Sequence, residues 1–272
     1  MLKSPKYLFE KNENIWGYLY NIINSHRGII LFLDYDGTLV PIKKTPSLAV
    51  LSPTIHELLI RLAKKRNLKL VLVSGRSHSD LKSLVRIQNI LMVTNHGFRI
   101  SSEKITWVHP GLKKMLPSLN KFSLLLKREL NNFSGAVVEN KKLTLTVHFR
   151  NVENHLMPIL KNNIYKLLQK YSNKLITTLG KKVIEVRPKI EWNKGKAVLK
   201  VLTMIRNREK KYCVIYIGDD KTDEEAFEIL DDKAITIRVG WSNNSHAKYY
   251  LKNPREVQLF LNKIESLNSI RS

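Results

Sequence analysis

Short apolar runs alternate with segments of helical periodicity along most of the chain. Between residues 28 and 98 the apolar runs GIILFLDYDG, LKLVLVSGR and ILMVTNHG are separated by SPTIHELLIRLAKKR and SDLKSLVRI, whose apolar residues recur at helical spacing. Ser52 followed by Pro53 predicts where the first of these helices begins. The same alternation returns after residue 194. Strands that alternate with helices predict a parallel sheet covered by helices, which is a doubly wound α/β core.

The pattern changes between about residues 110 and 188. The stretch LTLTVHFR, residues 143–150, alternates strictly between apolar and polar side chains, which predicts a half-buried strand with Thr144, Thr146, His148 and Arg150 on its polar face. IYKLLQKY and VIEVRP predict a helix and another strand. We expect a smaller α/β cap domain, residues 110–188, inserted into a core of residues 28–109 and 189–272. Residues 1–27 are expected to form a mostly helical lead-in.

The composition is that of a globular chain with a large excess of positive charge. Of its 272 residues 43% are hydrophobic, and Lys and Arg outnumber Asp and Glu by 47 to 23, which gives a net charge of +24. The lysines are scattered, with no aromatic-interleaved RNA motif and no zinc-finger spacing. We therefore expect no specific nucleic-acid partner, although the charge would attract anionic substrates.

The apolar runs are too short for a membrane protein. None approaches the roughly 18 to 20 residues that span a bilayer, and the first residues lack the apolar stretch of a signal peptide. We expect a cytoplasmic monomer without a membrane partner. The single cysteine, Cys213, lies in the apolar run YCVIYIG and is expected to be a buried, inert thiol.

Polar residues follow four predicted strands at their carboxyl ends, which is the edge where open α/β sheets bind ligands. These residues are Asp34 and Asp36, then Ser74, Gly75 and Arg76, then Asn95 and His96, then Gly218, Asp219 and Asp220. Asp34 and Asp219, with a backbone carbonyl and waters, would form an oxygen-only shell that suits Mg²⁺ better than Zn²⁺.

Local explanations compete for both acidic stretches. DYDGT is not an EF-hand loop, because a loop counted from Asp34 needs Gly and Glu where the chain has Leu39 and Thr45. An ordinary Asp-Gly turn remains an alternative explanation of this stretch. In GDDKTDEE, Thr222 with Glu225 predicts a capping box, which leaves the preceding Gly-Asp-Asp unexplained.

The ordered motifs DYDGT, SGR, NKG and GDDKTDE resemble those of the haloacid dehalogenase superfamily of phosphatases, over residues 28–270. The resemblance implies that Asp34 attacks phosphorus to form an aspartyl-phosphate. It implies that Asp36 protonates the leaving oxygen and then takes a proton from the attacking water. Gly37 would permit the turn between them, and Thr38 would help to fix Asp36.

The same resemblance fills in the rest of the expected site. Ser74 would hydrogen-bond the phosphoryl group and Lys194 would hold its charge, although Ser74 could also be a strand-end cap and Lys194 one of many surface lysines. Lys194 stands with Lys196 at a helix start, where positive charge opposes the dipole unless anions lie opposite. We expect substrate contacts from Thr38, Gly75 and Arg76, and metal contacts from Asp34, Asp36, Asp219 and Asp220, with Asp223 as an alternative to Asp220.

The stretches VENKKLTLTVHFRNV, GKKVIEVRPKIEWNKGKAV and YIGDDKTDEEAF are similar to trehalose-6-phosphate phosphatases. In that family a Glu-x-Lys pair and a later Glu contact sugar hydroxyls, and these map to Glu139, Lys141 and Glu185, with Arg150 a further candidate. Carboxylates that accept hydroxyl protons would orient such a sugar. A solvated strand face, with Glu185 paired to Arg187, is the alternative.

The resemblance implies Mg²⁺-dependent hydrolysis of trehalose 6-phosphate. The chain departs from the family at Arg99, where the family usually has Glu after His-Gly-x, and this puts substrate affinity in doubt more than chemistry. Other candidates are a phosphatase for sucrose phosphate or mannosylglycerate phosphate, a phosphomannomutase-like enzyme, or an inactive basic module that binds nucleic acid.

Overall fold

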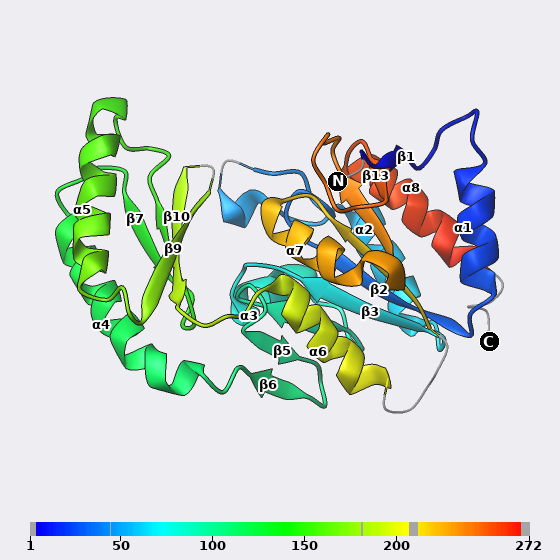
Figure 1. Cartoon of the computed structure of the whole chain (residues 1–272), viewed down its shortest axis with the longest axis horizontal. Coiled ribbons are helices and arrows are strands. Elements are labelled where there is room, and N and C mark those ends of the chain that lie inside the picture. The colour runs from blue at the N-terminus through cyan, green and yellow to red at the C-terminus, as the bar shows by residue number, and fades with distance from the viewer. Residues whose placement is uncertain (1–3, 44, 181, 207–211, 268–272) are drawn as a thin grey trace. The chain divides into compact units, whose positions relative to one another are not determined.

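The computed structural model describes residues 4–43, 45–180, 182–206 and 212–267. The chain divides into two compact units, a larger one of residues 1–107 and 192–272 and a smaller one of residues 108–191 (Figure 1). The smaller unit is therefore an insertion in the larger, and it contains the predicted insert of residues 110–188. At the ends of the larger unit's two segments, the Trp107 and Trp192 rings pack with centroids 5.4 Å apart.

A mixed sheet forms the centre of the larger unit. Across the described residues nine strands follow the order β1-β13-β12-β11-β2-β3-β4-β5-β6. Neighbours from β1 to β4 pair in parallel, and β5 joins β4 antiparallel. The strands are β1 (Lys6–Tyr7), β2 (Gly28–Asp34), β3 (Leu68–Val73), β4 (Leu91–Thr94), β5 (Arg99–Ser101), β6 (Thr106–Val108), β11 (Tyr212–Gly218), β12 (Ile235–Val239) and β13 (Tyr249–Leu251).

Helices cover both faces of this sheet, as the alternating sequence predicted. Along β2, Ile29, Leu31 and Leu33 join one buried core, and Ile30 and Phe32 join the other. A strand covered on both sides has no polar face, which explains its continuous apolar sequence. The first core is covered by α1 (Ile15–Asn24), α2 (Pro53–Lys64), α3 (His78–Val85) and α8 (Pro254–Glu265), and the second by α6 (Lys194–Arg206) and α7 (Lys221–Leu230).

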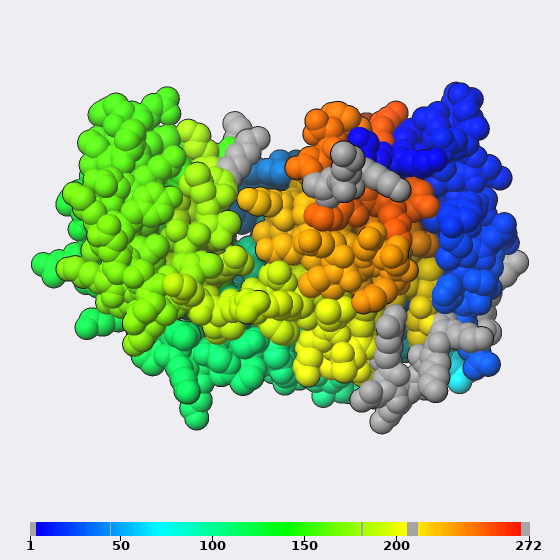
Figure 2. All heavy atoms as spheres, in the orientation of Figure 1, coloured from blue at the N-terminus to red at the C-terminus, as the bar shows by residue number. Residues whose placement is uncertain are grey.

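Figure 2 shows α6 and α7, in yellow and orange, as part of the outer surface of the larger unit, so their polar sides face solvent. The α2 prediction is confirmed: the Ser52 side chain accepts a hydrogen bond from the Ile55 amide, and Pro53 is the first helical residue. Short 3-10 turns at Pro46–Leu48 and Asp231–Lys233 complete the unit. Within the described ranges no helix combines the length and apolarity needed to cross a membrane.

Residues before β2 belong to the fold of the larger unit. The expected lead-in is helical at α1, which buries Leu19 and Ile23, but it also supplies β1. This strand pairs in parallel with β13 and extends the sheet edge. The Tyr7 hydroxyl donates a 2.7 Å hydrogen bond to Glu256 of α8, which fixes the strand.

The smaller unit is a four-stranded antiparallel sheet with two helices packed on one face. Its order is β7-β8-β10-β9, from β7 (Val137–Asn140), β8 (Leu145–His148), β9 (Leu175–Gly180) and β10 (Val183–Pro188). The helices are α4 (Leu112–Leu130) and α5 (Met157–Gln169), the latter preceded by a 3-10 turn at Asn154–Leu156. Their apolar sides share a core with Leu145, Val147 and Ile184.

The helix and strand expected from IYKLLQKY and VIEVRP are therefore present, as α5 and β10. The strand expected over residues 143–150 is shorter, and its polar face is not fully solvated. Thr144 and Thr146 are buried, and the Thr146 hydroxyl donates a 2.8 Å hydrogen bond to Glu185 on β10. Neighbouring strands on both sides of β8 supply this cover, which a pattern of alternation along one strand cannot reveal.

Core packing in the smaller unit is tested by two substitutions on α4. Phe122 is fully buried, and the centroid of its ring lies 5.2 Å from that of the Tyr171 ring. Phe122→Ala should therefore lower the free energy of unfolding by about 3–5 kcal/mol. Leu124, on the same helix, is 71% exposed, so Leu124→Ala should change stability by less than about 0.5 kcal/mol. Urea titration followed by circular dichroism measures both, and equal losses would contradict this assignment of the core.

Candidate active site

The carboxyl ends of four neighbouring strands carry the polar residues that the sequence singled out. The sheet order β11-β2-β3-β4 sets these strand ends side by side. Asp34 is the last residue of β2, Ser74 follows β3, Asn95 follows β4 and Asp219 follows β11. Residues separated by almost 200 positions thus reach one edge of the sheet.

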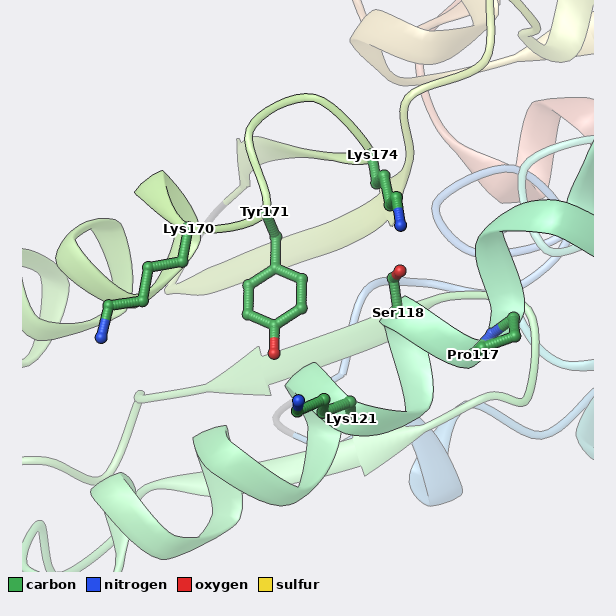
Figure 3. Close-up of a pocket in the computed structure, with 6 residues that line it drawn as sticks. All are labelled: Pro117, Ser118, Lys121, Lys170, Tyr171 and Lys174. Carbon is green, nitrogen blue, oxygen red and sulfur yellow. The ribbon is translucent and has the colours of Figure 1, made fainter.

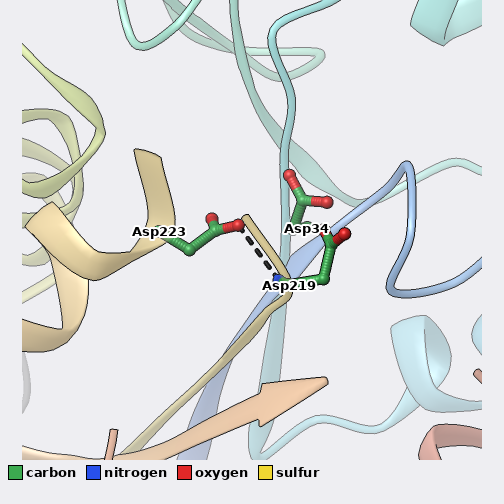
Figure 4. A group of neighbouring side chains, drawn as sticks. All are labelled: Asp34, Asp219 and Asp223. Atoms are coloured by element: carbon green, nitrogen blue, oxygen red, sulfur yellow. Dashed lines mark hydrogen bonds between the residues drawn. The ribbon is translucent and has the colours of Figure 1, made fainter. Parts of the chain in front are cut away.

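Three aspartates form a compact acidic group at this edge. Asp34, Asp219 and Asp223 each place a carboxylate oxygen within 4.8 Å of the others (Figure 4). Asp34 is buried, and Asp219 Oδ1 is buried without a hydrogen-bond partner among the described residues. Buried acceptors without donors are rare in native proteins, because each costs desolvation energy. A bound cation would satisfy this one, so the residues present fit a metal ion.

A glycine keeps the space beside Asp219 open. Gly37 has φ +90°, and a Cβ built there would lie on the Asp219 carboxylate. The turn after Asp36 is closed by the Gly37 amide, which donates a 2.7 Å hydrogen bond to the Val40 carbonyl. Only glycine combines this backbone conformation with a free approach to the acidic group.

Lys194 is the cation that the structure places in this group. It is the first residue of α6, is 2% exposed, and donates hydrogen bonds of 2.9 Å to Asp34 Oδ1 and 3.0 Å to Asp223 Oδ1. The helix start is closed by Asn193, whose side-chain oxygen accepts from the Lys196 amide. The alternative of an ordinary surface lysine is therefore wrong. The charge that opposes the helix dipole faces carboxylates, as expected.

Burial and crowding shift the pKa values of the whole group. Burial raises the pKa of Asp34 well above its usual value despite the charge of Lys194. Burial and neighbouring carboxylates raise the pKa of Asp219 to about 7, and burial raises that of Asp223 to about 6. Burial opposes the charge on Lys194, but the surrounding carboxylates raise its pKa well above the usual value. The group thus holds more negative charge than one lysine neutralises, which again suits a divalent cation.

The start of α7 differs from the expected capping box. Asp220 is the N-cap and accepts hydrogen bonds from the Thr222 and Asp223 amides, while Asp223 closes the box from the third helical position. The helix begins earlier than the pair of Thr222 and Glu225 predicted, because Asp220 caps it at Lys221. The Asp220 side chain is half exposed and lies 3.6 Å from Lys194, outside the acidic group, which contains Asp223 instead.

Asp223 has a full set of donors. Its Oδ2 accepts 3.1 Å hydrogen bonds from the Asp219 and Asp220 amides, and its Oδ1 accepts from Lys194 and from the Tyr216 hydroxyl at 2.7 Å. Figure 4 shows the bond from the Asp219 amide. Asp34 and Asp219 are therefore better candidates than Asp223 for direct metal contact. The role of Tyr216 was not predicted, because the residue lies within the apolar run of β11 and no local pattern marks it.

Asp36 and Arg76 form an ion pair that the sequence did not predict. The guanidinium of Arg76 donates 2.7 Å hydrogen bonds to both Asp36 oxygens, and its remaining nitrogen donates to Asp80. The Pro46 carbonyl accepts a further bond, and the Tyr35 ring lies 5.3 Å from the guanidinium. Arg76 therefore pairs with Asp36, and the described bonds use four of its five N–H donors, which leaves one N–H on Nη1 for the expected substrate contact. The Asp36 side chain is likewise outside the acidic group, so only its backbone carbonyl remains a candidate metal ligand.

Two buried hydroxyls flank the acidic turn. Thr38 is fully buried and its hydroxyl has no hydrogen-bond partner in the described part of the chain, so the structure does not show the expected bond to Asp36. Ser74 is buried and its oxygen accepts a 3.1 Å hydrogen bond from the Arg76 amide, which leaves the hydroxyl proton for an acceptor. Gly75 follows at the strand end, where a Cβ would clash with the His96 ring. The bond from the Arg76 amide is one that a strand-end cap makes, and the contact of Ser74 with a phosphoryl group stays a prediction.

A second polar cluster lies on the open face of the smaller sheet. The register sets Glu139 and Glu185 on either side of Thr146, and Lys141 lies 3.2 Å from the Glu185 carboxylate. His148 Nε2 donates a 2.8 Å hydrogen bond to Glu139. Burial would raise the pKa of Glu139, but His148 and Lys141 outweigh it and lower the pKa. Glu139 is therefore a charged acceptor at neutral pH.

The cluster contains three of the four residues predicted to contact sugar. Arg150 lies beyond the end of β8, exposed, and has no hydrogen bond to the cluster in the described residues. Glu185 pairs with Lys141 and Thr146 rather than with Arg187. Thr146 and His148 are members that the prediction did not single out, although the alternating pattern placed both on this face. Arg99 is elsewhere, on β5 opposite Thr94.

Comparison with known proteins agrees with this architecture. A haloacid dehalogenase-like hydrolase from Bacteroides thetaiotaomicron has the same fold, with a TM-score of 0.59 and 16% identity over 87% of this chain and 99% of that one. The chain thus shares the fold of that haloacid dehalogenase-like hydrolase. The family model described as Trehalose-phosphatase matches residues 32–255, and the chain belongs to this family.

Relatives within the family are similar over most of their length. Trehalose-phosphate phosphatase B of Arabidopsis thaliana is 34% identical over 260 residues, which are 89% of this chain and 68% of that protein. A solved trehalose-6-phosphate phosphatase related protein has a TM-score of 0.77 and 28% identity, over 89% of this chain and all of that one.

The buried ion pairs of Lys194 lead to a stability prediction. Lys194→Met leaves Asp34 and Asp223 without their cation and should cost about 3–5 kcal/mol of unfolding free energy at neutral pH. The loss should shrink as pH falls, because a carboxyl group with a raised pKa in the folded chain binds protons preferentially when folded. Urea titration without divalent metal measures this. Lys221→Met, at an exposed position, is the control; losses of equal size would contradict the assignment.

Proposed function

We propose that this phosphatase hydrolyses trehalose 6-phosphate to trehalose and phosphate and uses Mg²⁺. One observation carries the proposal: the buried pair of Asp34 and Lys194 stands beside Asp219 at the sheet edge of a chain that belongs to the trehalose-phosphatase family. The Arabidopsis relative supports the substrate, since its name denotes a trehalose-phosphate phosphatase.

Asp34 acts as the nucleophile in this reaction. One of its carboxylate oxygens bonds to phosphorus while the bond from phosphorus to the sugar oxygen breaks, and Asp36 gives a proton to that oxygen. A water molecule then attacks phosphorus, Asp36 takes its proton, and the Asp34 carboxylate leaves. Lys194 already bonds Asp34 Oδ1, so the carboxylate is oriented before substrate arrives.

Asp36 needs to exchange partners to carry a proton. Both of its oxygens are occupied by Arg76, but its side chain is 40% exposed and can turn. Arg76 stays in place through Asp80 and the Pro46 carbonyl while Asp36 moves. Asp36 is thus paired with Arg76 before the reaction and pairs with it again after the proton has been transferred.

The remaining groups at this edge bind and neutralise the phosphoryl group. Ser74 and Thr38 offer hydroxyl protons, and Lys194 contributes a positive charge that the protein has already desolvated. Mg²⁺, when bound, supplies further charge neutralisation, and Asp34, Asp219 and the Asp36 backbone carbonyl would hold it. Asp223 keeps Lys194 and the Asp219 backbone in position.

The sugar half is recognised by the cluster of Glu139, Lys141 and Glu185, together with His148. Trehalose offers hydroxyl groups and little apolar surface, so charged acceptors and donors give orientation and specificity. These side chains are already hydrogen-bonded to one another, which limits the ordering cost of binding.

A panel of sugar phosphates tests the proposed substrate. The purified chain should release phosphate from trehalose 6-phosphate with a higher kcat/KM than from sucrose phosphate, mannosylglycerate phosphate or glucose 6-phosphate. Removal of Mg²⁺ with a chelator should abolish release, and added Mg²⁺ should restore it. A clear preference for another ester would overturn the substrate assignment, and full activity in chelator would overturn the role of the metal.

Substitution within the sugar cluster tests the smaller unit separately. Glu139→Gln and Glu185→Gln should each raise KM about tenfold through one lost charged hydrogen bond, with a smaller change in kcat. Glu153→Gln is the matched control, since Glu153 is exposed and its one ion pair is with His155. Steady-state kinetics distinguish these cases; an unchanged KM in both cluster variants would exclude the cluster from substrate binding.

A further inference from the structure

The smaller unit has a basic pocket on the helical side of its sheet. A hollow of about 430 Å³ is lined by Pro117, Ser118 and Lys121 of α4 and by Lys170, Tyr171 and Lys174 after α5. In Figure 3 the Tyr171 hydroxyl points toward Lys121, the Lys174 side chain points toward Ser118, and Lys170 lies on the far side of the Tyr171 ring. All of these residues belong to one compact unit.

The polar groups of this pocket are not used by the fold. Among the described residues, Ser118, Tyr171 and the three lysines make no side-chain hydrogen bond or ion pair. No carboxylate in the described part of the chain lines the hollow. Glu129, on the same helix as Lys121, instead accepts a 2.9 Å hydrogen bond from Asn163. Three lysines and no described acid line the hollow, so its surface carries positive charge that an anion would neutralise.

Ring packing and backbone hydrogen bonds stabilise the segment that carries the pocket residues after α5. Tyr171 packs its ring on the buried Phe122, and its carbonyl accepts 2.8 Å hydrogen bonds from the Lys174 and Leu175 amides. Lys189, after β10, bonds both ends of this turn, through its amide to the Lys174 carbonyl and through its ammonium to the Ser172 carbonyl. The backbone that carries these donors is therefore held in place.

This pocket is separate from the sugar cluster. The pocket residues stand on α4 and on the connection that follows α5, and these helices cover the sheet face formed by Leu145, Val147 and Ile184. Glu185 and Thr146 alternate with those residues and therefore lie on the opposite face. A molecule in the pocket and a sugar at the cluster would not compete for the same atoms.

We propose that this pocket binds a small phosphorylated metabolite, independently of the phosphatase reaction. Three ammonium donors and two hydroxyl donors, with no acid, match the several acceptor oxygens of a phosphate ester. The volume is within the range of roughly 300–1,000 Å³ that small-molecule sites occupy, and is more than a single small ion needs. The wall of Pro117 and the Tyr171 ring suits the carbon skeleton.

Lysine footprinting with inorganic tripolyphosphate as the probe tests this site in the full chain. Acetylation of Lys121, Lys170 and Lys174 should fall when the probe is present, while Lys113 on α4 and Lys166 on α5 should react as before. These two lysines are exposed on the same helices but do not line the pocket. Equal protection of all five would show diffuse attraction by the basic surface and overturn the proposal.

Calorimetric titration of paired variants provides the second measurement. Lys121→Gln combined with Lys174→Gln should weaken tripolyphosphate binding by about tenfold or more, since two charge-assisted contacts are lost. Lys113→Gln with Lys166→Gln should weaken it by less than about twofold. Both pairs change exposed residues, and circular dichroism checks that they fold. Binding that persists without protection of the pocket lysines would place the anion at the catalytic edge and refute the site.

Discussion

The hydrogen-bonded ion pairs of buried Lys194 are the interaction on which the larger unit depends. They join the end of β2 to the starts of α6 and α7, three segments that are distant in sequence. Burying an ammonium with two carboxylates costs a large hydration energy, which is recovered only when the partners are held at bonding distance. The fold holds them there through close packing: at Gly195, a Cβ would collide with the Glu225 backbone of α7. The close packing of α6 against α7 thus also fixes the distances within the site.

This constraint also explains why the site is prepared for phosphate chemistry. Asp34 cannot move without breaking its bond to Lys194, so the carboxylate proposed as the nucleophile is held in one orientation. The acidic group retains an excess of negative charge and an unsatisfied oxygen on Asp219, which a divalent cation relieves. Asp36 differs because its side chain is 40% exposed, although its partner Arg76 is buried. One carboxylate is held and the other can turn, which suits the proposed roles of nucleophile and proton carrier.

The sequence predicted those features that follow from local rules. The α/β alternation, the start of α2 and the polar strand ends were visible because periodicity and capping act over a few residues. The pair of Asp36 and Arg76, 40 positions apart, was not visible, since the motifs assigned Asp36 to proton transfer and metal contact and Arg76 to substrate binding. The capping box at Asp220 was misplaced because two overlapping pairs of residues fit the same signal. The burial of Thr146 likewise comes from the neighbouring strands β7 and β10, which the alternation of residues along β8 cannot reveal.

The central claim is that Asp34, oriented by Lys194, accepts the phosphoryl group. Acid quenching of the enzyme during turnover of phosphorus-labelled trehalose 6-phosphate, followed by peptide mass spectrometry, tests this most directly. The account predicts a phosphoryl group on the peptide that contains Asp34, removable by hydroxylamine and absent from Asp34→Asn, which should fold but release no phosphate. Turnover by the Asn variant, or a label on any other peptide, would contradict it.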